Sequence, residues 1–428
     1  MIKVLFTHLL LLCLFCINPL EAAWSKPVTI SSPISSVPEV SIDAFGNGVA
    51  IWKEFDGAFT NVQAATFVKG KHWKKPTTLS SVLGNNDQAN PQVSINTLGY
   101  AVAVWEEFDG TNSIVRSSTL PFGGTWSPPV TISAPTFDSS QIPQVAVDPM
   151  GNAVAVWQRH NGSFNITQAA TLPFEGTWST PVDISLTTID TFSPQVGVDN
   201  FGNAIAVWTN VTNQIIQGAT LPFGGAWTAP VNISSSSDLS NVPDLAVNPA
   251  GNGVAVWTAL SSGNFFTQAS TFTPGGGWTA PTDISSIGVT SFEVEAAIDN
   301  FGNAVAVWSV SSIGTDIFIQ SAYLPFGSIW SAPVTLSSSG GQAFDAHVGF
   351  DALGNATAVW DFNDGVQVLI QSSMLPFGGS WTTPQNISSA GQVSDSPQIS
   401  IDPLGFALVV WVNETFSSIQ SASWTPHP

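Results

Sequence analysis

One string of eleven residues recurs eight times along the chain and limits the folds that the chain can adopt. VDNFGNAIAVW (198–208) has close copies at 42–52, 95–105, 147–157, 247–257, 298–308, 350–360 and 401–411. The tryptophans that end these copies follow one another at intervals close to 51 residues, a spacing typical of repeat architectures. A second tryptophan series alternates with the first, and the two series account for all 17 tryptophans. We therefore expect eight equivalent structural units, numbered here one to eight in chain order.

Each unit has the pattern of four short strands. In unit four, PQVGVD (194–199) alternates apolar with small or polar residues, NFGN supplies a glycine turn, and AIAVW resumes a strand, which together predict a β-hairpin. A third string, IIQGATLP (215–222), leads through a second glycine turn, FGG, to a fourth string, WTAPVNIS (227–234). No stretch shows a convincing amphipathic helical pattern. The unit is therefore expected to be a four-stranded antiparallel sheet.

This repeat predicts an all-β fold, a single eight-bladed β-propeller of four-stranded antiparallel blades that spans residues 23–428. The chain begins with a lone fourth-strand string, WSKPVTIS (24–31), and its last unit ends after three strands. We expect the N-terminal strand to join the last blade and close the ring, because closure removes the unpaired edges of an open sheet.

The D-x-x-G-N turn between two strands resembles the repeat propellers of bacterial exported proteins and is distantly similar to the Asp-box blades of sialidases. The resemblance covers residues 24–428. It implies the architecture, but such propellers serve many unrelated functions. The sialidase Asp-box, in which Asp, Gly and Trp lie much closer together, is not present in this sequence.

Residues 1–22 have the pattern of a secretory signal peptide, with Lys3, an apolar run and a small-residue end. We therefore expect an exported protein, either periplasmic or extracellular and at the cell surface. A single spanning helix and a lipid anchor at Cys16 are the alternatives for this segment. Both cysteines, Cys13 and Cys16, lie within it, so the mature chain has no disulfide, thiol nucleophile or cysteine metal site.

The formal net charge is −20, and no lysine or arginine follows Arg159. This distribution argues against binding to nucleic acid or to an anionic membrane surface through counterion release. It is the charge pattern of an acidic, soluble surface. We expect a monomer without a transmembrane span in the mature chain.

The aspartates of the repeated turns are expected to accept hydrogen bonds from the backbone amides of those turns. They are Asp43, Asp148, Asp199, Asp299, Asp351 and Asp402, with Asn96 and Asn248 in the two remaining units. A ring of Ca²⁺ sites is the alternative, but the spacing lacks the run of oxygen ligands that calcium usually takes. We expect no cofactor and no metal site.

The loops between second and third strands vary between units and share one face of the predicted disc, where binding residues usually lie. In units one, two, seven and eight, which are consecutive in a closed ring, these loops are acidic and aromatic. Carboxylates beside exposed aromatic rings suit a carbohydrate or a protein ligand, whereas the alternative is a solvated acidic rim. The predicted loop sector comprises Glu54, Phe55, Asp56, Glu106, Glu107, Phe108, Asp109, Asp361, Phe362, Asp364 and Glu414.

A polar residue also lies four positions before the turn Asp or Asn in every unit. On an innermost strand this position would line the central channel, either as a ligand pocket or only to satisfy backbone groups and ordered water. The predicted channel ring comprises Glu39, Gln92, Gln144, Gln195, Asp244, Glu295, His347 and Gln398.

Three functions remain for such a chain. We expect a non-enzymatic binding or adhesion module for a carbohydrate or protein ligand, with a structural envelope protein and a carboxylate-dependent glycoside hydrolase as alternatives. The arginine triad of sialidases cannot be assembled, because Arg116 and Arg159 are the only arginines. No catalytic residue is predicted, because nothing in the sequence selects one carboxylate pair.

Overall fold

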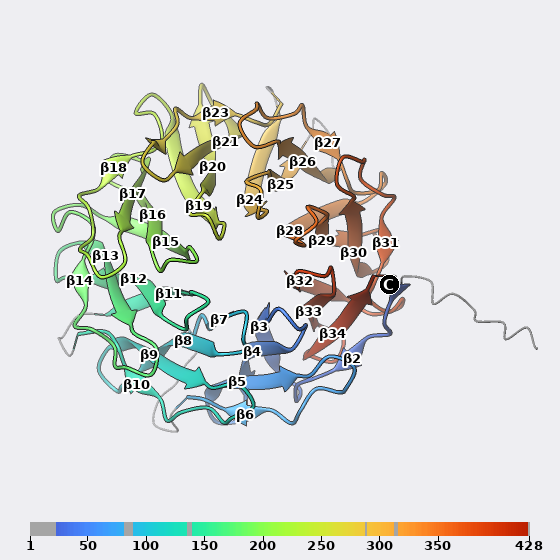
Figure 1. The fold of residues 1–428 in the computed structure, drawn as a ribbon. Helices are drawn as coiled ribbons and strands as arrows, with labels where there is room; N and C mark the ends of the chain where they lie inside the picture. The colour runs from blue at the N-terminus through green and yellow to red at the C-terminus, as the bar shows by residue number, and fades with distance from the viewer. Residues whose placement is uncertain (1–22, 81–88, 135–138, 287–288, 312–315, 427–428) are drawn as a thin grey trace, which may run out of the picture.

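The computed structural model describes residues 23–80, 89–134, 139–286, 289–311 and 316–426. The described residues form β-strands joined by turns and loops, and no helix occurs among them. The strands are arranged as sheets around a central axis, which is a β-propeller (Figure 1). The prediction of an all-β propeller is confirmed, whereas the predicted signal peptide, residues 1–22, lies outside the described residues. No described segment forms a helix long and apolar enough to cross a bilayer.

Each unit contributes an inner strand and two long middle strands, and units one to seven each contribute a short outer strand as well. The inner strands are β3 (Ser35–Ile42), β7 (Gln92–Ile95), β11 (Ser140–Val147), β15 (Thr191–Val198), β19 (Leu239–Val247), β24 (Thr290–Ile298), β28 (Gln342–Phe350) and β32 (Ser394–Ile401). The second strands are β4 (Gly48–Phe55), β8 (Ala101–Phe108), β12 (Ala153–His160), β16 (Ala204–Asn210), β20 (Gly253–Ser261), β25 (Ala304–Ser311), β29 (Ala356–Asn363) and β33 (Ala407–Asn413).

The third strands are β5 (Thr60–Phe67), β9 (Ser113–Leu120), β13 (Asn165–Leu172), β17 (Ile215–Leu221), β21 (Asn264–Thr273), β26 (Ile317–Leu324), β30 (Val368–Leu375) and β34 (Ser418–Thr425). The outer strands of units one to seven are β6 (Thr77–Thr78), β10 (Val130–Thr131), β14 (Val182–Asp183), β18 (Val231–Asn232), β23 (Thr282–Asp283), β27 (Val334–Thr335) and β31 (Gln385–Asn386). Unit five has one further short strand, β22 (Gly277–Trp278).

Hydrogen bonding groups the described strands into seven sheets, because one eight-stranded sheet contains two units. Units six and seven are joined there by a single parallel pairing, Ile317 with Gln342. The N-terminal strands β1 (Ala23–Trp24) and β2 (Val28–Thr29) both pair antiparallel with β34. The outer strands of unit eight therefore come from the N-terminal end of the described chain.

The repeated turn is held by its aspartate. Asp199 Oδ1 accepts hydrogen bonds from the backbone N–H groups of Phe201 and Asn203, both at 2.8 Å, and Oδ2 accepts one from the Asn203 side chain at 2.7 Å. The glycine of the next unit's turn, Gly251, has φ +83°, and a Cβ there would lie 2.9 Å from Asp199 Oδ2. The predicted capping role of the turn aspartates is confirmed, and the turn glycine is needed both for its φ and for close contact between units.

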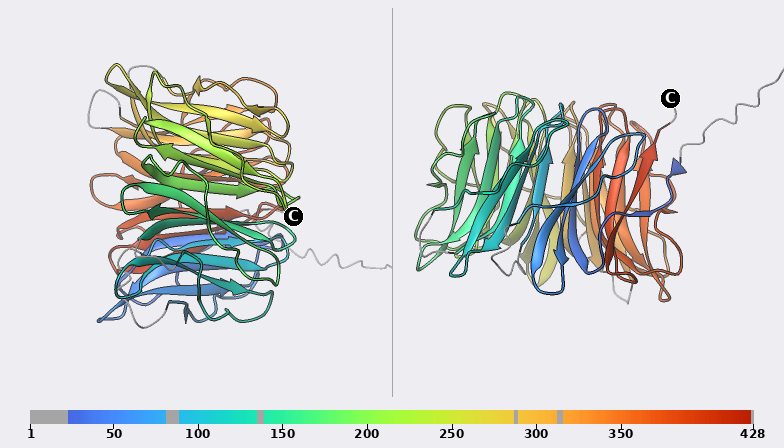
Figure 2. Two further views of the ribbon diagram at one scale, coloured as in Figure 1. Left: turned by 90° about the vertical axis from the view of Figure 1, so that its left-hand side faces the viewer. Right: turned by 90° about the horizontal axis from the view of Figure 1, so that it is seen from below.

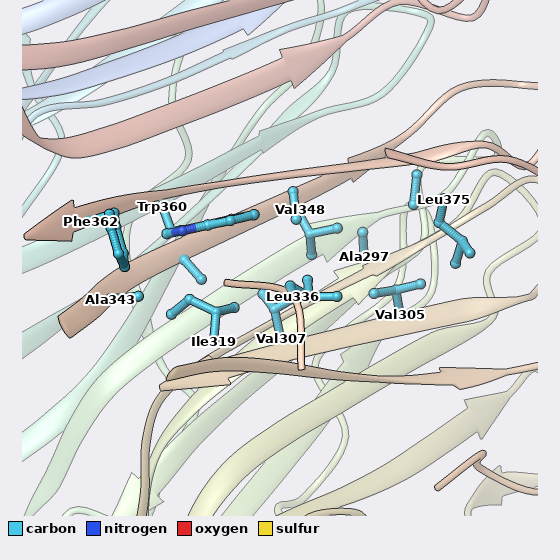
Figure 3. Close-up of a cluster of buried hydrophobic side chains, with 13 residues drawn as sticks. Ala297, Val305, Val307, Ile319, Leu336, Ala343, Val348, Trp360, Phe362 and Leu375 are labelled. Carbon is cyan, nitrogen blue, oxygen red and sulfur yellow. The ribbon is translucent and has the colours of Figure 1, made fainter. Parts of the chain in front are cut away.

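The tryptophan of each second strand fills the space between neighbouring units. All eight are 0% exposed. Around Trp360, Val348 of the same unit packs with Val307 and Ile319 of the preceding unit (Figure 3). Burial of one such aromatic side chain contributes about 3 kcal/mol or more to stability. The tryptophan therefore recurs at this spacing because each unit packs against the next one through it.

The strands run between the two faces of the disc (Figure 2). One face, here called the turn face, carries the D-x-x-G-N turns and the connections between third and fourth strands. The opposite face, here called the loop face, carries the loops between second and third strands and the connections between units. This division follows from the antiparallel order of the strands within each unit.

Unit eight departs from the turn pattern, and we predict that Lys69 compensates for the difference. Phe406 replaces the turn asparagine, so only its backbone N–H donates to the buried Asp402 carboxylate, at 2.9 Å, and the side-chain amide that donates to Oδ2 in other units is missing. Lys69 Nζ of unit one lies 2.8 Å from Asp402 Oδ2 and 4.5 Å from the centre of the Phe406 ring. Lys69→Met leaves this carboxylate without its cation, so we expect a loss of about 2 to 4 kcal/mol in the free energy of unfolding, measured by denaturant titration.

The control for this prediction restores the asparagine. In a Phe406→Asn background the new amide can donate to Asp402, so Lys69→Met should cost less there than in the native background. Equal unfolding curves for the native protein and Lys69→Met would contradict the prediction.

Candidate functional site

The inner strands carry the predicted channel ring. All eight ring residues are partly buried, and several contact the next unit around the channel. Glu39 accepts from the Gln92 side chain at 3.1 Å, and Asp244 accepts from the backbone N–H of Ala296 at 2.9 Å. The ring side chains therefore link neighbouring units across the inner edge of the sheets, in addition to facing the channel.

Two residues before each ring position, the inner strand has a residue with positive φ. The values lie between 35° and 52°, a conformation that side chains other than glycine rarely adopt. Where the inner strand pairs with the second strand both before and after this residue, the pairing register shifts at it, as in a β-bulge. Examples are the shift between Phe344 and His347 and the shift between Phe292 and Glu295. The eight residues are Val37, Asn90, Ile142, Ser193, Val242, Glu293, Asp345 and Ser396.

Units six and seven differ from the other units at this bulge. Proline follows the bulge residue in six units, but Val294 and Ala346 take its place in units six and seven. The bulge residues of the same two units are acidic, Glu293 and Asp345. Strained backbone at a channel mouth is a common property of functional sites, and here it coincides with a local change of chemistry. This part of the loop face is the candidate site.

His347 lies at the centre of the candidate site. Its Nδ1 contacts Glu295 Oε2, and its Nε2 lies 3.6 Å from Asp345 Oδ1 and 3.1 Å from the Gln398 amide nitrogen. Burial opposes protonation of the imidazole, but the charge of Glu295 and the hydrogen bonds of Asp345 and Glu295 outweigh it, so the pKa of His347 is well above its ordinary value. The site therefore holds an imidazolium between two carboxylates.

Glu293 connects the two unusual bulges. Its Oε2 accepts a hydrogen bond from Ser309 Oγ at 2.9 Å and one from the backbone N–H of Asp345 at 3.2 Å. The side chain of one bulge residue thus holds the backbone of the next, which fixes the position of the Asp345 carboxylate. That carboxylate is 43% exposed and available to a ligand.

Two further carboxyl groups come from units seven and eight. Burial, followed by the charges of Asp345 and Asp395, raises the pKa of Asp361 to about 8. Asp361 is 8% exposed, and its Oδ1 has no hydrogen-bond partner among the described residues. Burial, followed by the charges of Glu414 and Asp345, raises the pKa of Asp395 to about 6. The site therefore combines carboxyl groups that release their protons at different pH values.

Two ring carboxyl groups behave in the same way. Burial raises the pKa of Glu39 to about 7, against the positive charge of His347 and a hydrogen bond from Gln92. Burial, followed by the charge of Glu295, raises the pKa of Asp244 to about 7. The electrostatic coupling of both groups to His347 places them within reach of the same site.

A hollow of about 370 Å³ lies on the loop face between units eight and one. Phe55 and Glu414 line it together with Lys53, Thr60 and Ser36. The charge of Glu414 reaches Asp395, so this hollow adjoins the carboxyl cluster. Its volume is in the range of small-ligand sites, and an aromatic wall beside polar groups suits a sugar ring.

The other members of the predicted loop sector hold the structure of the loops. Glu54 and Glu107 accept hydrogen bonds from the indole N–H groups of Trp52 and Trp105, at 3.3 and 3.0 Å. Buried Glu106 lies 3.4 Å from the amide nitrogens of both Asn90 and Gln141. The side chains of these three predicted glutamates therefore satisfy neighbouring donors, and Glu106 does so across the boundary between units two and three.

The three loop aspartates of the sector cap the backbone of their own loops. Asp56 accepts from Ala58 and Phe59, and Asp109 and Asp364 make the corresponding pair of bonds two and three residues ahead. Phe362, predicted as an exposed aromatic, is 6% exposed and packs in the core (Figure 3). Phe55 and Phe108 are exposed, so these two rings remain accessible to a ligand.

Sequence reasoning missed three carboxyl groups of the cluster, Glu293, Asp345 and Asp395. All three precede the channel ring on an inner strand, and the bulge brings them to the mouth of the channel. The available signal was the replacement of the recurring proline in units six and seven, which marks where the backbone pattern changes. Among the described residues no group of three or more His, Cys, Asp or Glu has the geometry to hold a metal ion.

No protein-family model and no curated protein sequence matches the chain. Similar solved structures include an ulvan lyase, a polysaccharide lyase bound to -[GlcA(1-4)Rha3S]-, at 11% identity and TM-score 0.53 over 92% of this chain and 95% of that one. An α-L-arabinanase of Penicillium chrysogenum is 10% identical over 94% and 98% of the two chains, with TM-score 0.46. The intramolecular trans-sialidase of Ruminococcus gnavus is 9% identical over 92% and 95%, with TM-score 0.41.

These comparisons correct the functional expectation from the sequence. The ulvan lyase is a carbohydrate-processing enzyme, which conflicts with the expectation of a non-enzymatic binding or adhesion module and of no enzymatic activity. The alternative of a carbohydrate-cleaving enzyme agrees better with this likeness. At 11% identity the likeness to the lyase itself shows the fold, so the chemistry has to be argued from the residues of this chain.

Proposed function

We propose that the protein is a carbohydrate-active enzyme that hydrolyses glycosidic bonds with Asp345 and Asp395 at the loop-face mouth of the channel. The observation that carries the proposal is the raised pKa of Asp395, about 6, beside a second carboxylate held against an imidazolium. Glycoside hydrolysis needs one carboxyl group that gives a proton and another that acts as base or nucleophile. Two neighbouring carboxyl groups can take these two roles when their surroundings differ, because one then keeps its proton at a pH at which the other has lost it.

In this mechanism Asp395 is the general acid. With a pKa of about 6 it keeps its proton in mildly acidic solution and can transfer it to the oxygen of the leaving sugar. Asp345 acts on the anomeric carbon, either directly or through a water molecule. Its place is fixed by Glu293 at its backbone N–H and by His347 at its carboxylate.

The hollow between units eight and one supports binding of a sugar next to this pair. Phe55 offers a ring face for stacking, and Glu414 and Thr60 offer hydrogen-bonding oxygens. The local charge favours neutral sugars or sugars that carry an amine. Lys53 in the hollow and His347 are the cations of this site, and the carboxyl groups of Asp345, Asp361, Asp395 and Glu414 outnumber them. Anionic polysaccharides would be repelled by the carboxyl cluster.

The site is best understood in an eight-bladed ring that the N-terminal strands complete. Support comes from the eight sequence repeats, from the pairing of β1 and β2 with β34, and from the packing of β3 against β32. Closure makes units eight and one neighbours, which brings the hollow beside Asp395. The composition of residues 1–22 supports an exported enzyme, which would meet polysaccharides outside the cytoplasm.

The test is a depolymerisation screen of the purified protein on neutral, amino-bearing and uronate polysaccharides. We expect new reducing ends from one or more members of the first two classes and none from the uronates. The Asp345→Asn/Asp395→Asn double variant should release none. Equal release by the double variant, or no release from any neutral or amino-bearing polysaccharide, would overturn the proposal.

A further inference from the structure

A second hollow, of about 520 Å³, lies at the turn-face side of the boundary between units eight and one. Its floor is apolar, with Ile30, Phe67, Trp73 and Phe406 among the lining residues, and Lys26, Lys69, Lys71 and His72 line it as well. Its lining contains no Asp or Glu. An apolar floor beside amines is complementary to a ligand that carries both hydrocarbon and negative charge.

The basic residues of the chain gather around this hollow. Three of the nine lysines and arginines line it, Lys26, Lys69 and Lys71, and Lys74 and Lys75 follow Lys71 closely in the chain. Lys69 is paired with Asp402, whereas the other four are exposed and no carboxylate of the described residues is recorded within 4.0 Å of them. The hollow between units three and four is similar in volume, about 570 Å³, but has Asp183 and no lysine in its lining. The charge is therefore a property of one boundary and not of the repeat.

The surrounding turn face is apolar. The second residue after the turn aspartate is large, apolar and 61–72% exposed in six units, namely Phe45, Met150, Phe201, Phe301, Leu353 and Leu404. A second row, from the turns between third and fourth strands, includes Phe122 and Phe223 at 70% and 63% exposed. A monomeric soluble protein rarely exposes so extensive an apolar surface without an interaction partner.

The acidic groups of the protein are almost absent from this face. The turn aspartates are buried, and in the turns of the described residues Glu175 is the one exposed carboxylate. The carboxyl cluster lies on the loop face, about 25 Å away for an eight-residue strand. That distance is roughly three Debye lengths at physiological ionic strength, so the turn face presents its own charge to a nearby surface.

The net charge of the chain argued against binding to an anionic membrane, but the structure gathers lysines on the turn face and leaves the exposed carboxylates mostly elsewhere. We propose that the turn face binds the surface of an anionic lipid bilayer, with the lysine-lined hollow receiving an anionic headgroup and the ring of exposed apolar side chains entering the interface. Apolar burial and attraction of lysines to anionic lipid act together in such binding. The arrangement directs the loop face, with its channel mouth, away from the membrane. This proposal does not depend on the proposed hydrolase activity.

A second copy of the chain is the competing occupant, but it matches the charge of this face less well. Two turn faces in contact would bring the lysine cluster of one molecule against a surface whose exposed carboxylate is Glu175 alone, among the described turns. The unpaired lysines would then lose water without gaining an anion, which is costly. An anionic bilayer supplies phosphate groups to all of them.

The experiment is vesicle co-sedimentation of the full protein with phosphatidylcholine vesicles and with vesicles that contain one third phosphatidylglycerol. We expect binding to the anionic vesicles and weaker binding to the neutral ones. Lys71→Gln/Lys75→Gln should lower the affinity for anionic vesicles roughly 30-fold, because each lysine near the surface contributes about fivefold. Phe201→Ser/Phe301→Ser should lower binding to both kinds of vesicle.

Matched controls come from the opposite face. Lys53→Gln/Arg159→Gln removes the same charge, and Phe59→Ser/Phe265→Ser removes the same apolar groups, and neither should change vesicle binding. Absence of binding, or equal loss in the loop-face variants, overturns the proposal. The proposal is also overturned if calorimetry shows binding of inorganic phosphate but the vesicles do not bind, because the hollow would then be an anion pocket only. It is likewise overturned if the vesicles do not bind and sedimentation velocity shows a dimer that Phe201→Ser/Phe301→Ser abolishes, because the face would then bind a second copy of the chain.

Discussion

Asp395→Asn lowers kcat/KM on a cleaved glycan by about 10²- to 10⁴-fold, because the amide has no proton to give to the leaving oxygen. In the native enzyme the pKa of about 6 predicts that the rate falls as pH rises through this value, since the acid must be protonated to act. The variant should lose this alkaline limb together with its rate. Initial rates of reducing-end release between pH 4 and pH 9 measure both effects.

The matched control is Asp283→Asn, which makes the same chemical change on an outer strand. Asp283 Oδ1 accepts from the Gln268 side chain at 2.8 Å and lies in unit five, away from the carboxyl cluster. Its rate and pH profile should equal those of the native enzyme. A native pH profile in Asp395→Asn, at any absolute rate, would remove Asp395 from the role of acid.

Asp361→Asn stabilises the protein at pH 9, by on the order of 2 kcal/mol in the free energy of unfolding. The folded-state pKa, about 8, is raised above the ordinary value of 3.8, so the folded protein holds a proton that the unfolded chain has lost. The resulting stability is complete below the unfolded pKa and disappears as pH rises through about 8. Above that pH a buried carboxylate with an unpartnered Oδ1 remains, and a neutral amide of the same shape avoids it.

Denaturant titrations at pH 5, 7 and 9 test this expectation. The native protein should lose stability steadily over this range, because the raised pKa values of Glu39, Asp244 and Asp395 act in the same direction as that of Asp361. The gap between Asp361→Asn and the native protein should widen in favour of the variant as pH rises. A gap that is the same at all three pH values would show that Asp361 is not the titrating group.

Asp56→Asn supplies a control of opposite sign. Backbone hydrogen bonds from Phe59 and Ala58 lower the pKa of Asp56, so its carboxylate stabilises the loop above the unfolded pKa and loses that effect as pH falls. The variant should therefore not gain stability between pH 5 and pH 9. Both substitutions remove one negative charge, so the comparison separates burial from net charge.

Local regularities of the sequence predicted much of the fold. The spacing of Asp, Gly and Trp in VDNFGNAIAVW predicted a hairpin whose aspartate caps the turn, and the structure has those bonds. The lone N-terminal string predicted strands that pair with the last unit, as β1 and β2 do with β34. These features were accessible because they depend on neighbours in the chain or on an exact repeat.

Several side chains of the predicted loop sector have partners within the protein, so they are not free to contact a ligand. Glu54 and Glu107 lie two residues after a tryptophan on the same strand, so they face the same side and accept its indole N–H. Phe362, two residues after Trp360, joins the core for the same reason of strand alternation. Composition marked these loops as acidic and aromatic, but the direction of each side chain decided what remained accessible.

The repeat, the strands, the turn chemistry and the overall charge could be read from the residues alone, because each is a property of short segments or of sums along the chain. Which charges meet depends on how the units pack. The tertiary structure placed Glu293 and Asp345, on bulges of the inner strands, near Asp361 and Asp395, and it gathered Lys26 beside Lys71 at the boundary between units eight and one. Electrostatic coupling depends on distance in space, and the packing of β3 against β32 brings the first and last units together although they are far apart in the chain.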